Sequence, residues 1–312
     1  MLLFLWRREK QLDREQNPHH LGRKPMPIIV GSPRSGTTLL RLMLDSHKEL
    51  AIPPETSFLK LGANMRGSGD RLREKFFQAI VSYPKPVTSW PDFGITEADF
   101  RAALAEVEPF TAAEGFRTFY KLYAARFGKT RWGDKTPLYC MEIDSIRRVL
   151  PEGRFIHIIR DGRDAALSLR EMWFSPGPDI KTQAAFWRKC VTTARRAGTG
   201  RSDYFEVRYE DLILDTRSTL ERVCKFVGLG FDEAMLSYYE RAPERLKEHK
   251  GRWRPDGTAL LTQEQRLRQQ RRAIKPPDPE CVFAWKRSMS VKERAAFQRV
   301  AGDLLEELGY EV

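Results

Sequence analysis

The segment from Pro27 to Leu44, PIIVGSPRSGTTLLRLML, limits the possible folds of this chain more than any other. The β-branched residues Ile28 to Val30 predict a short strand, and apolar residues recur at helical spacing from Leu39 to Leu44. The loop Gly31 to Thr38 joins the two. A strand, a tight loop and a helix in this order gather backbone N–H groups and a helix N-terminus around one point. This arrangement predicts a site for a phosphate-like anion.

The two glycines of this loop have the spacing of a Walker A loop, Gly31-x-x-x-x-Gly36, but Thr37 stands where that loop carries a lysine. The cation is Arg34, inside the loop. In P-loop kinases the lysine and a Mg²⁺ ion neutralise a dianionic phosphoryl group. A sulfuryl group carries less negative charge, so an arginine, hydroxyls and backbone dipoles suffice to stabilise its transfer. We therefore expect no metal in this site.

Composition agrees with a globular α/β protein that binds anions. The chain has 312 residues, of which 41% are hydrophobic and 31% charged, enough for one large domain or two small ones. Its net charge of +12 favours anionic ligands, including nucleic acid or an anionic membrane surface. The basic residues are scattered, with local density only at 241–254 and 266–272, and no nucleic-acid-binding motif accompanies them. We interpret them as a solvated surface plus a polyanion site, and expect no nucleic-acid partner.

The cysteines and the N-terminus predict a cytoplasmic protein. The four cysteines form no CxxC pair, as expected for buried thiols in a reducing compartment. The chain begins MLLFLWRREK, whose apolar run of six residues is too short to span a membrane and has its charges on the wrong side for a signal peptide. We expect residues 1–26 to form an N-terminal arm and the chain to lack a transmembrane segment. For the apolar run, an interfacial or packing role is preferred, and a truncated membrane anchor is the alternative.

The phrase SPRSGTT before an apolar helix resembles the 5′-phosphosulfate loop of sulfotransferases that use 3′-phosphoadenosine-5′-phosphosulfate (PAPS) and release 3′,5′-adenosine bisphosphate (PAP). The resemblance implies a P-loop-like, doubly wound parallel sheet flanked by helices, with the cofactor at the carboxyl ends of the strands. It implies that the 5′-phosphosulfate is held by Arg34, Ser35, Gly36, Thr37 and Thr38. The alternatives are a P-loop-type kinase and a non-catalytic protein that binds nucleotides or polyanions.

Glu55 is the expected catalytic base. Pro53 and Pro54 deny this segment a helix at its start and should hold Glu55 near the mouth of the loop. A carboxylate there could take the proton from an acceptor hydroxyl, or serve as a first-turn charge on a following helix. The Glu55-Thr56 segment after an LxxMLxxH-type helix resembles tyrosylprotein sulfotransferases and bacterial relatives, and this resemblance implies the role of base.

Lys135 is the second expected catalytic residue, with Arg34. In KTRWGDKTP we expect a turn at Asp134–Pro137 that starts a helix over Leu138–Val149, with Pro137 in its first position. The turn resembles the K-[TD]-P element of sulfotransferases. That resemblance implies that Lys135 contacts the bridging oxygen of the cofactor and stabilises the charge of the leaving phosphate. Without the family resemblance, a surface lysine paired with Asp134 is the simpler interpretation.

The segment RFIHIIRDGRDAALSLR predicts a second strand and helix. Phe155 to Ile159 is a continuous apolar run, typical of a buried parallel strand, and it ends in Arg160 where a Walker B strand would end in aspartate. The pattern resembles the 3′-phosphate-binding segment of sulfotransferases, which implies that Arg160 and Ser168 contact the 3′-phosphate.

The C-terminal third offers weaker site candidates. The phrase RYEDL resembles a sulfotransferase element that places Tyr209 beside the adenine or phosphate; a tyrosine satisfied at a strand end is the alternative. We expect Arg252 to Pro279 to be a loop-like, mobile part of a cofactor cover over about 250–290. A W-[KR] segment before the last helix implies that Lys286 or Arg287 reaches the 3′-phosphate.

The whole pattern predicts one domain over residues 27–312. A mainly helical insertion over about 60–128, with helices at 70–83 and 112–127, is where we expect acceptor choice to reside. The expected reaction is in-line sulfuryl transfer to a hydroxyl. The acceptor class stays open between a small molecule, a carbohydrate, a lipid and a peptide tyrosine, and so does the oligomeric state.

Overall fold

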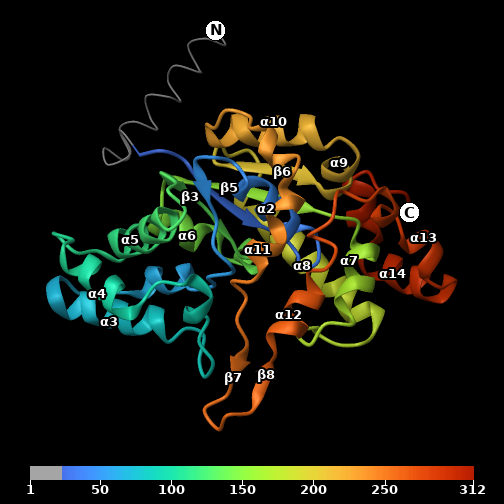
Figure 1. Ribbon diagram of the computed structural model, residues 1–312. Coiled ribbons are helices and arrows are strands. Elements are labelled where there is room, and N and C mark those ends of the chain that lie inside the picture. Colours follow the sequence, from blue (N-terminus) through green and yellow to red (C-terminus); the bar gives the residue numbers. More distant parts are fainter. Residues whose placement is uncertain (1–22) are drawn as a thin grey trace.

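A parallel four-stranded sheet in the order β4-β1-β5-β6 forms the centre of the molecule (Figure 1). The computed structural model describes residues 23–312, so the apolar start of the expected N-terminal arm lies outside the described residues. The strands are β1 (Met26–Val30), β4 (Asp134–Lys135), β5 (Gly153–Ile159) and β6 (Tyr204–Arg208). Because β1 lies between β4 and β5, the strand order reverses at β1, and the carboxyl ends beside it form the crevice typical of doubly wound sheets. The expected fold class is confirmed.

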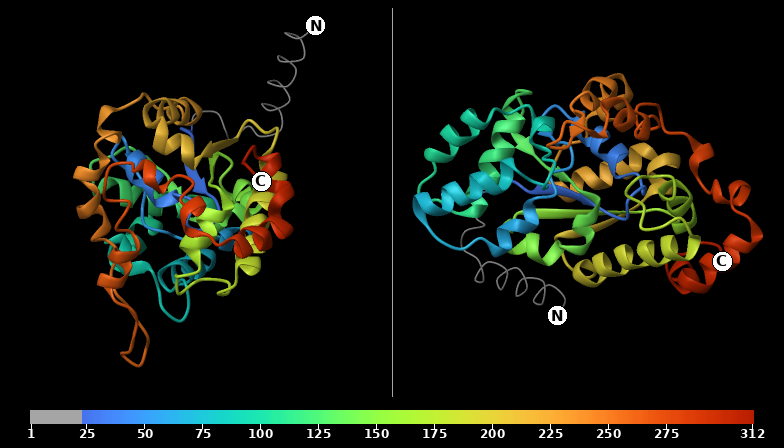
Figure 2. Two further views of the ribbon diagram at one scale, coloured as in Figure 1. Left: turned by 90° about the vertical axis from the view of Figure 1, so that its right-hand side faces the viewer. Right: turned by 90° about the horizontal axis from the view of Figure 1, so that it is seen from below.

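Helices cover both faces of the sheet, as the continuous apolar runs of β1 and β5 require (Figure 2). On one face, Ile29 and Ile156 pack in a cluster with the helices α2 (Thr37–Asp45), α9 (Tyr209–Leu214), α10 (Thr216–Val227) and α11 (Ala242–Leu246). On the other, Ile28 and Phe155 pack with α3 (Gly69–Val81), α4 (Glu97–Ala105), α5 (Ala112–Ala125) and α6 (Ile143–Val149). A third cluster joins α7 (Gly162–Leu169), α8 (Ile180–Gly198), α13 (Trp285–Ser288) and α14 (Val291–Glu307).

Short elements complete the chain. A two-stranded parallel ribbon joins β2 (Leu50–Ala51) to β3 (Arg131–Trp132). The 3₁₀ helices are η2 (Leu59–Asn64), η3 (Trp90–Phe93), η4 (Pro137–Met141), η5 (Glu233–Met235), η6 (Tyr238–Glu240) and η7 (Pro279–Cys281). Within residues 23–312, no helix combines the length and apolarity needed to cross a membrane. The four cysteines are free and buried, as expected.

The insertion between β1 and β4 is mainly helical, as predicted. Helices α3 and α5 lie within two residues of the expected bounds. The aromatic side chains of α5 are buried against Phe58, Phe76 and Trp90, so they form the core of this helical region. They pack as their spacing indicates and do not line the main cavity.

The expected turn after Gly133 is wrong, and the expected helix with Pro137 at its start is confirmed only in part. Asp134 and Lys135 form strand β4, which pairs in parallel with β1 at Ile28 and Ile29. The following helix is broken into η4 and α6, with Glu142 in a non-helical conformation between them. The cause is the carbonyl of Pro137, which accepts a hydrogen bond from Gly31 N–H at 3.0 Å and so serves the loop after β1.

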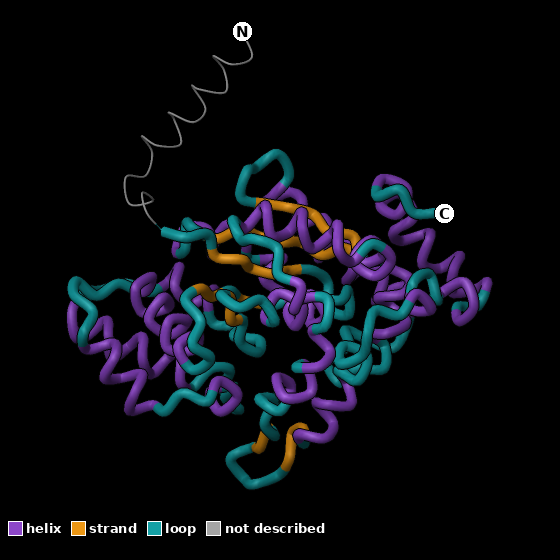
Figure 3. The backbone as a smooth tube through the Cα atoms, turned by 45° about the horizontal axis from the view of Figure 1, so that its top comes forward, coloured by secondary structure: helices purple, strands orange, loops and turns teal. Residues whose placement is uncertain are grey.

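The expected loop over 252–279 is wrong in part, because this segment contains regular structure. An antiparallel ribbon of β7 (Arg252–Trp253) and β8 (Ala259–Leu261) projects from the body of the molecule, and helix α12 (Gln263–Gln269) follows (Figure 3). Helix α12 begins with a capping box between Thr262 and Gln265. That T-x-x-Q pattern is a local signal for a helix start that the expectation of a loop overlooked.

Candidate active site

The loop after β1 curls tightly around the N-terminus of α2. Arg34 and Gly36 both have left-handed backbone conformations, with φ values of 69° and 94°. Such a φ is uncommon for arginine. At Gly36 a Cβ atom would lie 2.4 Å from the Tyr209 ring, so only glycine fits this position. The first-turn N–H groups of a helix, here those of Thr37 and Thr38, have no intrahelical acceptor and can bind an anion.

A cavity of about 480 Å³ opens at the carboxyl ends of the strands. Its walls come from the loop, from Arg160 after β5, from the end of α7 and the segment that follows it, from the helical region and from the segment 249–281. Most of the predicted site residues line it, although they are up to 175 positions apart: Arg34, Gly36, Thr37, Thr38, Glu55, Arg160, Ser168 and Tyr209.

Arginines from distant segments converge in this cavity. Arg34 Nε donates to Ser168 Oγ at 3.0 Å, and Arg160 donates to the Arg34 carbonyl at 3.2 Å. The Arg160 guanidinium lies over the Tyr209 ring, 4.5 Å from its centroid. Burial, together with repulsion from Arg160 and Arg272, lowers the pKa of Arg34 from its ordinary value. Such a cluster of cations is stabilised by a bound polyanion.

Glu55 and Lys135 form an ion pair beside the loop. The Lys135 Nζ atom lies 2.5 Å from a Glu55 carboxylate oxygen and 3.4 Å from Thr38 Oγ1. The lysine side chain is only 2% exposed, whereas that of Glu55 is 46% exposed and faces the cavity. Burial lowers the pKa of Lys135, and the charge of Glu55 opposes this shift. A carboxylate and an ammonium group therefore lie together where the cavity meets α2.

Asp134 is not the surface partner of Lys135 that the alternative interpretation required. It is a buried carboxylate that supports the Glu55–Lys135 pair. Its carboxylate accepts hydrogen bonds from Thr56 and Tyr120, both at 2.6 Å, and is fully buried. Burial raises the pKa of Asp134, and these hydroxyls oppose the shift. Thr56 follows Glu55 in the chain, and Lys135 follows Asp134. The buried hydrogen bond between Thr56 and Asp134 therefore holds both members of the ion pair in place. Glu55 opens no helix, since η2 begins only at Leu59.

Four predicted residues do not line the cavity. Lys135 is buried behind Glu55, and the side chain of Ser35 is buried within the loop, where its hydroxyl has no partner among the described residues. Lys286 and Arg287 are exposed, pair with Glu311 and Glu280 respectively, and do not line the cavity.

Other basic residues line the cavity instead, and the sequence analysis missed them. Arg252, Arg266 and Arg272 come from the two basic runs, which we interpreted as a solvated surface plus a polyanion site, and Lys275 follows the second run. Arg245, from the first run, is partly buried, with its Nε atom 2.6 Å from an Asp45 oxygen. The solvated-surface part of that interpretation is wrong for these positions. No local pattern reveals this, because the carboxylate partners of Arg245, Arg252 and Arg266 lie far away in the sequence.

The donor set fits a nucleotide with more than one anionic group. Helix N–H groups, three threonines and five arginines line the cavity. The Nε atom of Arg160 is buried and has no hydrogen-bond partner among residues 23–312. A doubly wound sheet, an anion loop and an adjacent carboxylate define a group-transfer enzyme that uses a polyanionic nucleotide.

Comparison with known proteins identifies the transferred group. Residues 25–233 match the model of the sulfotransferase family. Nodulation protein NoeE of Sinorhizobium fredii is 26% identical over 313 residues, covering 92% of this chain and 67% of that protein. Protein-tyrosine sulfotransferase 2 of Gallus gallus is 25% identical over 301 residues, again covering 92% and 67%. The sulfotransferase domain of the Synechococcus PCC 7002 olefin synthase has the same fold, with a TM-score of 0.64, 24% identity and coverage of 95% and 98%.

The chain belongs to the sulfotransferase family, because the family model matches more than half of it. The protein is therefore a sulfotransferase, and PAPS is the sulfuryl donor of this family. The expected enzyme class, fold and donor are confirmed.

Proposed function

We propose that this cavity binds PAPS and transfers its sulfuryl group to the hydroxyl of an apolar acceptor. Arg34, the loop from Ser35 to Thr38 and the N-terminus of α2 hold the 5′-phosphosulfate, while Arg160 and Ser168 hold the 3′-phosphate. The observation that carries the proposal is the convergence of Arg34, Arg160 and Arg272 on one cavity, where burial and the two neighbouring arginines lower the pKa of Arg34.

Glu55 and Lys135 perform the transfer. Glu55 accepts the hydroxyl proton as the acceptor oxygen bonds to sulfur and the bridging S–O bond breaks. Lys135 and Arg34 stabilise the negative charge that remains on the phosphate oxygen. The 2.5 Å contact between Glu55 and Lys135 supports these roles, because it places the base and the cation on the same side of the loop.

Arg272 is our candidate for the third contact to the 3′-phosphate. It lines the cavity, and its charge lowers the pKa of Arg34. Lys286 and Arg287, which the family resemblance favoured, are outside the cavity and paired with glutamates. A contact from either would require a rearrangement of the segment after η7.

The acceptor side of the cavity favours an apolar alcohol or phenol. Four exposed apolar side chains line its walls: Leu138, Trp173, Phe174 and Leu260. Exposed apolar groups concentrated around a reaction site indicate a ligand that covers them. Pro84, Val87 and Ser89 of the helical insertion also line the cavity, which supports a role of that region in acceptor choice. A tyrosine peptide, the acceptor named in the chicken relative, is the second candidate.

We further propose a reducing, cytoplasmic location, which the four free buried thiols support.

The donor assignment is tested by calorimetric titration with PAP and with AMP, which lacks the 3′-phosphate. We expect wild-type protein to prefer PAP by at least about tenfold. Arg160→Ala should remove most of this preference, Arg34→Ala should weaken both ligands, and the exposed Arg299→Ala should change neither. Equal binding of PAP and AMP by the wild type would refute the assignment.

The acceptor class is tested with a panel of long-chain alcohols, phenols, sugars and tyrosine peptides, using PAPS as donor. We expect apolar alcohols or phenols to have the highest kcat/KM. Trp173→Ala should raise the acceptor KM several-fold, because the exposed indole lines the cavity, whereas Trp253→Ala on the projecting ribbon should not. A preference for sugars or acidic peptides would contradict the apolar assignment.

A further inference from the structure

His249 is a buried histidine in the wall of the cavity that none of the roles above uses. It follows α11 and is only 7% exposed. Its Nδ1 atom lies 2.9 Å from a terminal nitrogen of Arg266. A guanidinium can only donate, so Nδ1 must accept, and the neutral ring carries its proton on Nε2. That Nε2–H group is buried and has no acceptor among the described residues.

The imidazole is held in its neutral form. Burial lowers the pKa of His249 well below its usual range, and the nearby charges of Arg266, Arg41, Lys135 and Arg252 lower it further. A neutral ring whose Nδ1 lone pair is already used cannot act as a base. It can only donate a hydrogen bond, through Nε2.

Asp92 fixes this state from the helical region. Its carboxylate accepts from both terminal nitrogens of Arg266, at 2.9 and 2.8 Å, and from Arg252 at 2.9 Å. It also accepts from the backbone N–H of Lys250, the next residue after His249, at 2.9 Å. Asp92 is 2% exposed, so this contact is shielded from water and salt.

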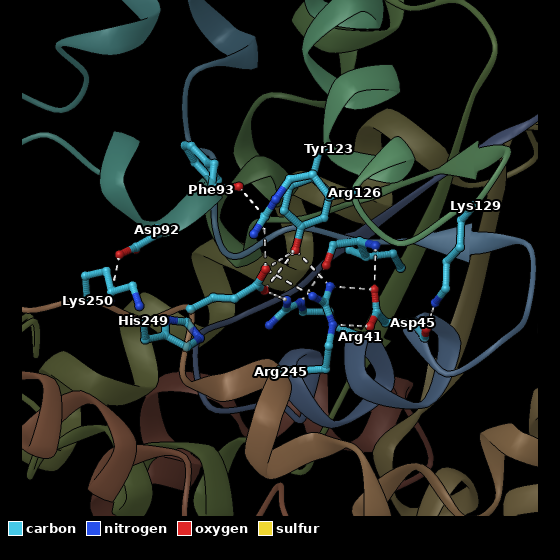
Figure 4. A network of polar contacts seen from close by, with 12 residues as sticks. Arg41, Asp45, Asp92, Phe93, Tyr123, Arg126, Lys129, Arg245, His249 and Lys250 are labelled. Atoms are coloured by element: carbon cyan, nitrogen blue, oxygen red, sulfur yellow. Dashed lines mark hydrogen bonds and ion pairs between the residues drawn. The ribbon is translucent and has the colours of Figure 1, made fainter. Parts of the chain in front are cut away.

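Glu248 fixes the histidine from the other side. Its carboxylate accepts from Tyr123 at 2.9 Å and pairs with Arg245 at 3.0 Å and Arg41 at 3.3 Å (Figure 4). Arg41 lies on α2, the helix that forms the anion site. His249 is therefore tied on one side to that helix and on the other to the insertion that lines the acceptor side.

A buried donor without an acceptor is rare in folded proteins, and one in the wall of a reaction cavity points to a ligand oxygen. We propose that His249 donates its Nε2–H to the attacking oxygen of the acceptor and so orients that oxygen between sulfur and Glu55. Asp92 and Arg266 are positioning residues that hold the required tautomer. This inference rests on the proposed function. It adds a specific contact to the acceptor hydroxyl, while proton removal remains with Glu55.

The first test is the tautomer, read from the ¹⁵N chemical shifts of the imidazole in the full chain. We expect a single neutral Nε2–H form from pH 6 to 8, with or without PAP. Arg266→Met should allow the Nδ1–H form to appear, because the donor to Nδ1 is gone. An Nδ1–H form or a charged ring in the wild type would overturn the proposal, whatever ligand the cavity takes.

The second test is transfer, with water as an acceptor that needs no identification: release of PAP from PAPS under single-turnover conditions. His249→Phe should lower the rate at least about tenfold, since one transition-state hydrogen bond is lost. His249→Gln, whose amide nitrogen can replace Nε2, should restore most of the rate. His249→Asn, whose amide nitrogen corresponds to Nδ1, should not.

PAP affinity separates the two hypotheses. All three His249 variants should bind PAP as tightly as the wild type. Equal rates in the wild type and His249→Phe, with PAP binding intact, would overturn the role of His249 and leave the proposed function standing. Loss of PAP binding in the wild type would instead remove the proposed function.

Discussion

At the scale of single residues, the active site depends on one buried ammonium group and one accessible carboxylate. Lys135 is held in place by strand β4 and buried, whereas Glu55 is half-exposed and reaches the cavity after two prolines. In the proposed mechanism the rigid member is the cation, which has to meet a fixed bridging oxygen. The accessible member is the proposed base, which has to meet incoming acceptors.

Replacing Glu55 by glutamine keeps the size and polarity of the side chain but removes its capacity to take a proton. We expect Glu55→Gln to lower turnover about 10²- to 10⁴-fold, while PAP affinity changes less than threefold. Glu221→Gln, an exposed change on α10, serves as the control. Turnover is measured with PAPS and the best acceptor, and PAP affinity by calorimetry. Full turnover in Glu55→Gln would exclude this residue as the base.

Residues that line the cavity were predictable where a local backbone pattern places them. Arg34 and Gly36 to Thr38 in the loop, and Arg160 at the end of an apolar strand, belong to continuous segments of this kind. Asp92 and His249 could not be found in this way. The contacts of Asp92 with Lys250 and Arg266 join segments more than 150 positions apart, His249 is held by Arg266 in this same arrangement, and an isolated aspartate or histidine carries no local signal.

At the scale of elements, the connection from β1 to α2 depends on its fit against β5 and α9. Gly36 caps α2 in a left-handed conformation and lies against the Tyr209 ring. Tyr209 in turn supports Arg160 through the face of its ring. The anion loop, the end of β5 and the start of α9 thus form one packed unit, and a change in the loop should affect both phosphate sites.

Gly36→Ala tests this unit. The added methyl group would lie 2.4 Å from a Tyr209 ring carbon, so the loop or the ring must move. We expect PAP affinity to fall at least about tenfold. Gly200→Ala is the matched control, because Gly200 also has a positive φ, of 81°, but a Cβ there meets nothing within 4 Å. It should cost about 1 kcal/mol in the free energy of unfolding and leave PAP affinity unchanged. Equal affinities in both variants would contradict the close fit.

Elements were predictable where periodicity runs over several turns, as in α3 and α5. The two-residue strand β4 was not, because a strand this short has no period. Its conformation is set by hydrogen bonds to β1 across the sheet. The same long-range bonding broke the expected helix after Lys135, by using the carbonyl of Pro137 for the loop.

At the scale of the whole molecule, the net charge of +12 does not describe how the charged and titratable groups are distributed, because several of them lie inside the protein. Partly buried ion pairs join α2 to α11, and the helical insertion to α12. Two histidines, His157 and His249, are enclosed in neutral form. Burial keeps these groups in one charge state in the folded protein, whereas they can titrate in the unfolded chain. The free energy of unfolding must therefore depend on pH.

His157 provides the clearest measure of this dependence. It lies fully buried in β5, with Nδ1 2.5 Å from the hydroxyl of Tyr204 on β6, and burial lowers its pKa to about 3. Between pH 6.5 and about 3, the unfolded chain binds a proton at this residue that the folded protein does not, so the free energy of unfolding falls as the pH falls. From pH 7 to pH 5 this single group should lower the free energy of unfolding by about 2 kcal/mol.

Urea unfolding of the wild type and of His157→Asn measures this loss. The variant should be less stable at pH 7 but lose about 2 kcal/mol less on acidification. Between pH 7 and 8 the difference between the two proteins should stay nearly constant, because His157 is mostly neutral in both states. An equal loss in both proteins from pH 7 to 5 would mean that the folded sheet accepts the proton as readily as the unfolded chain.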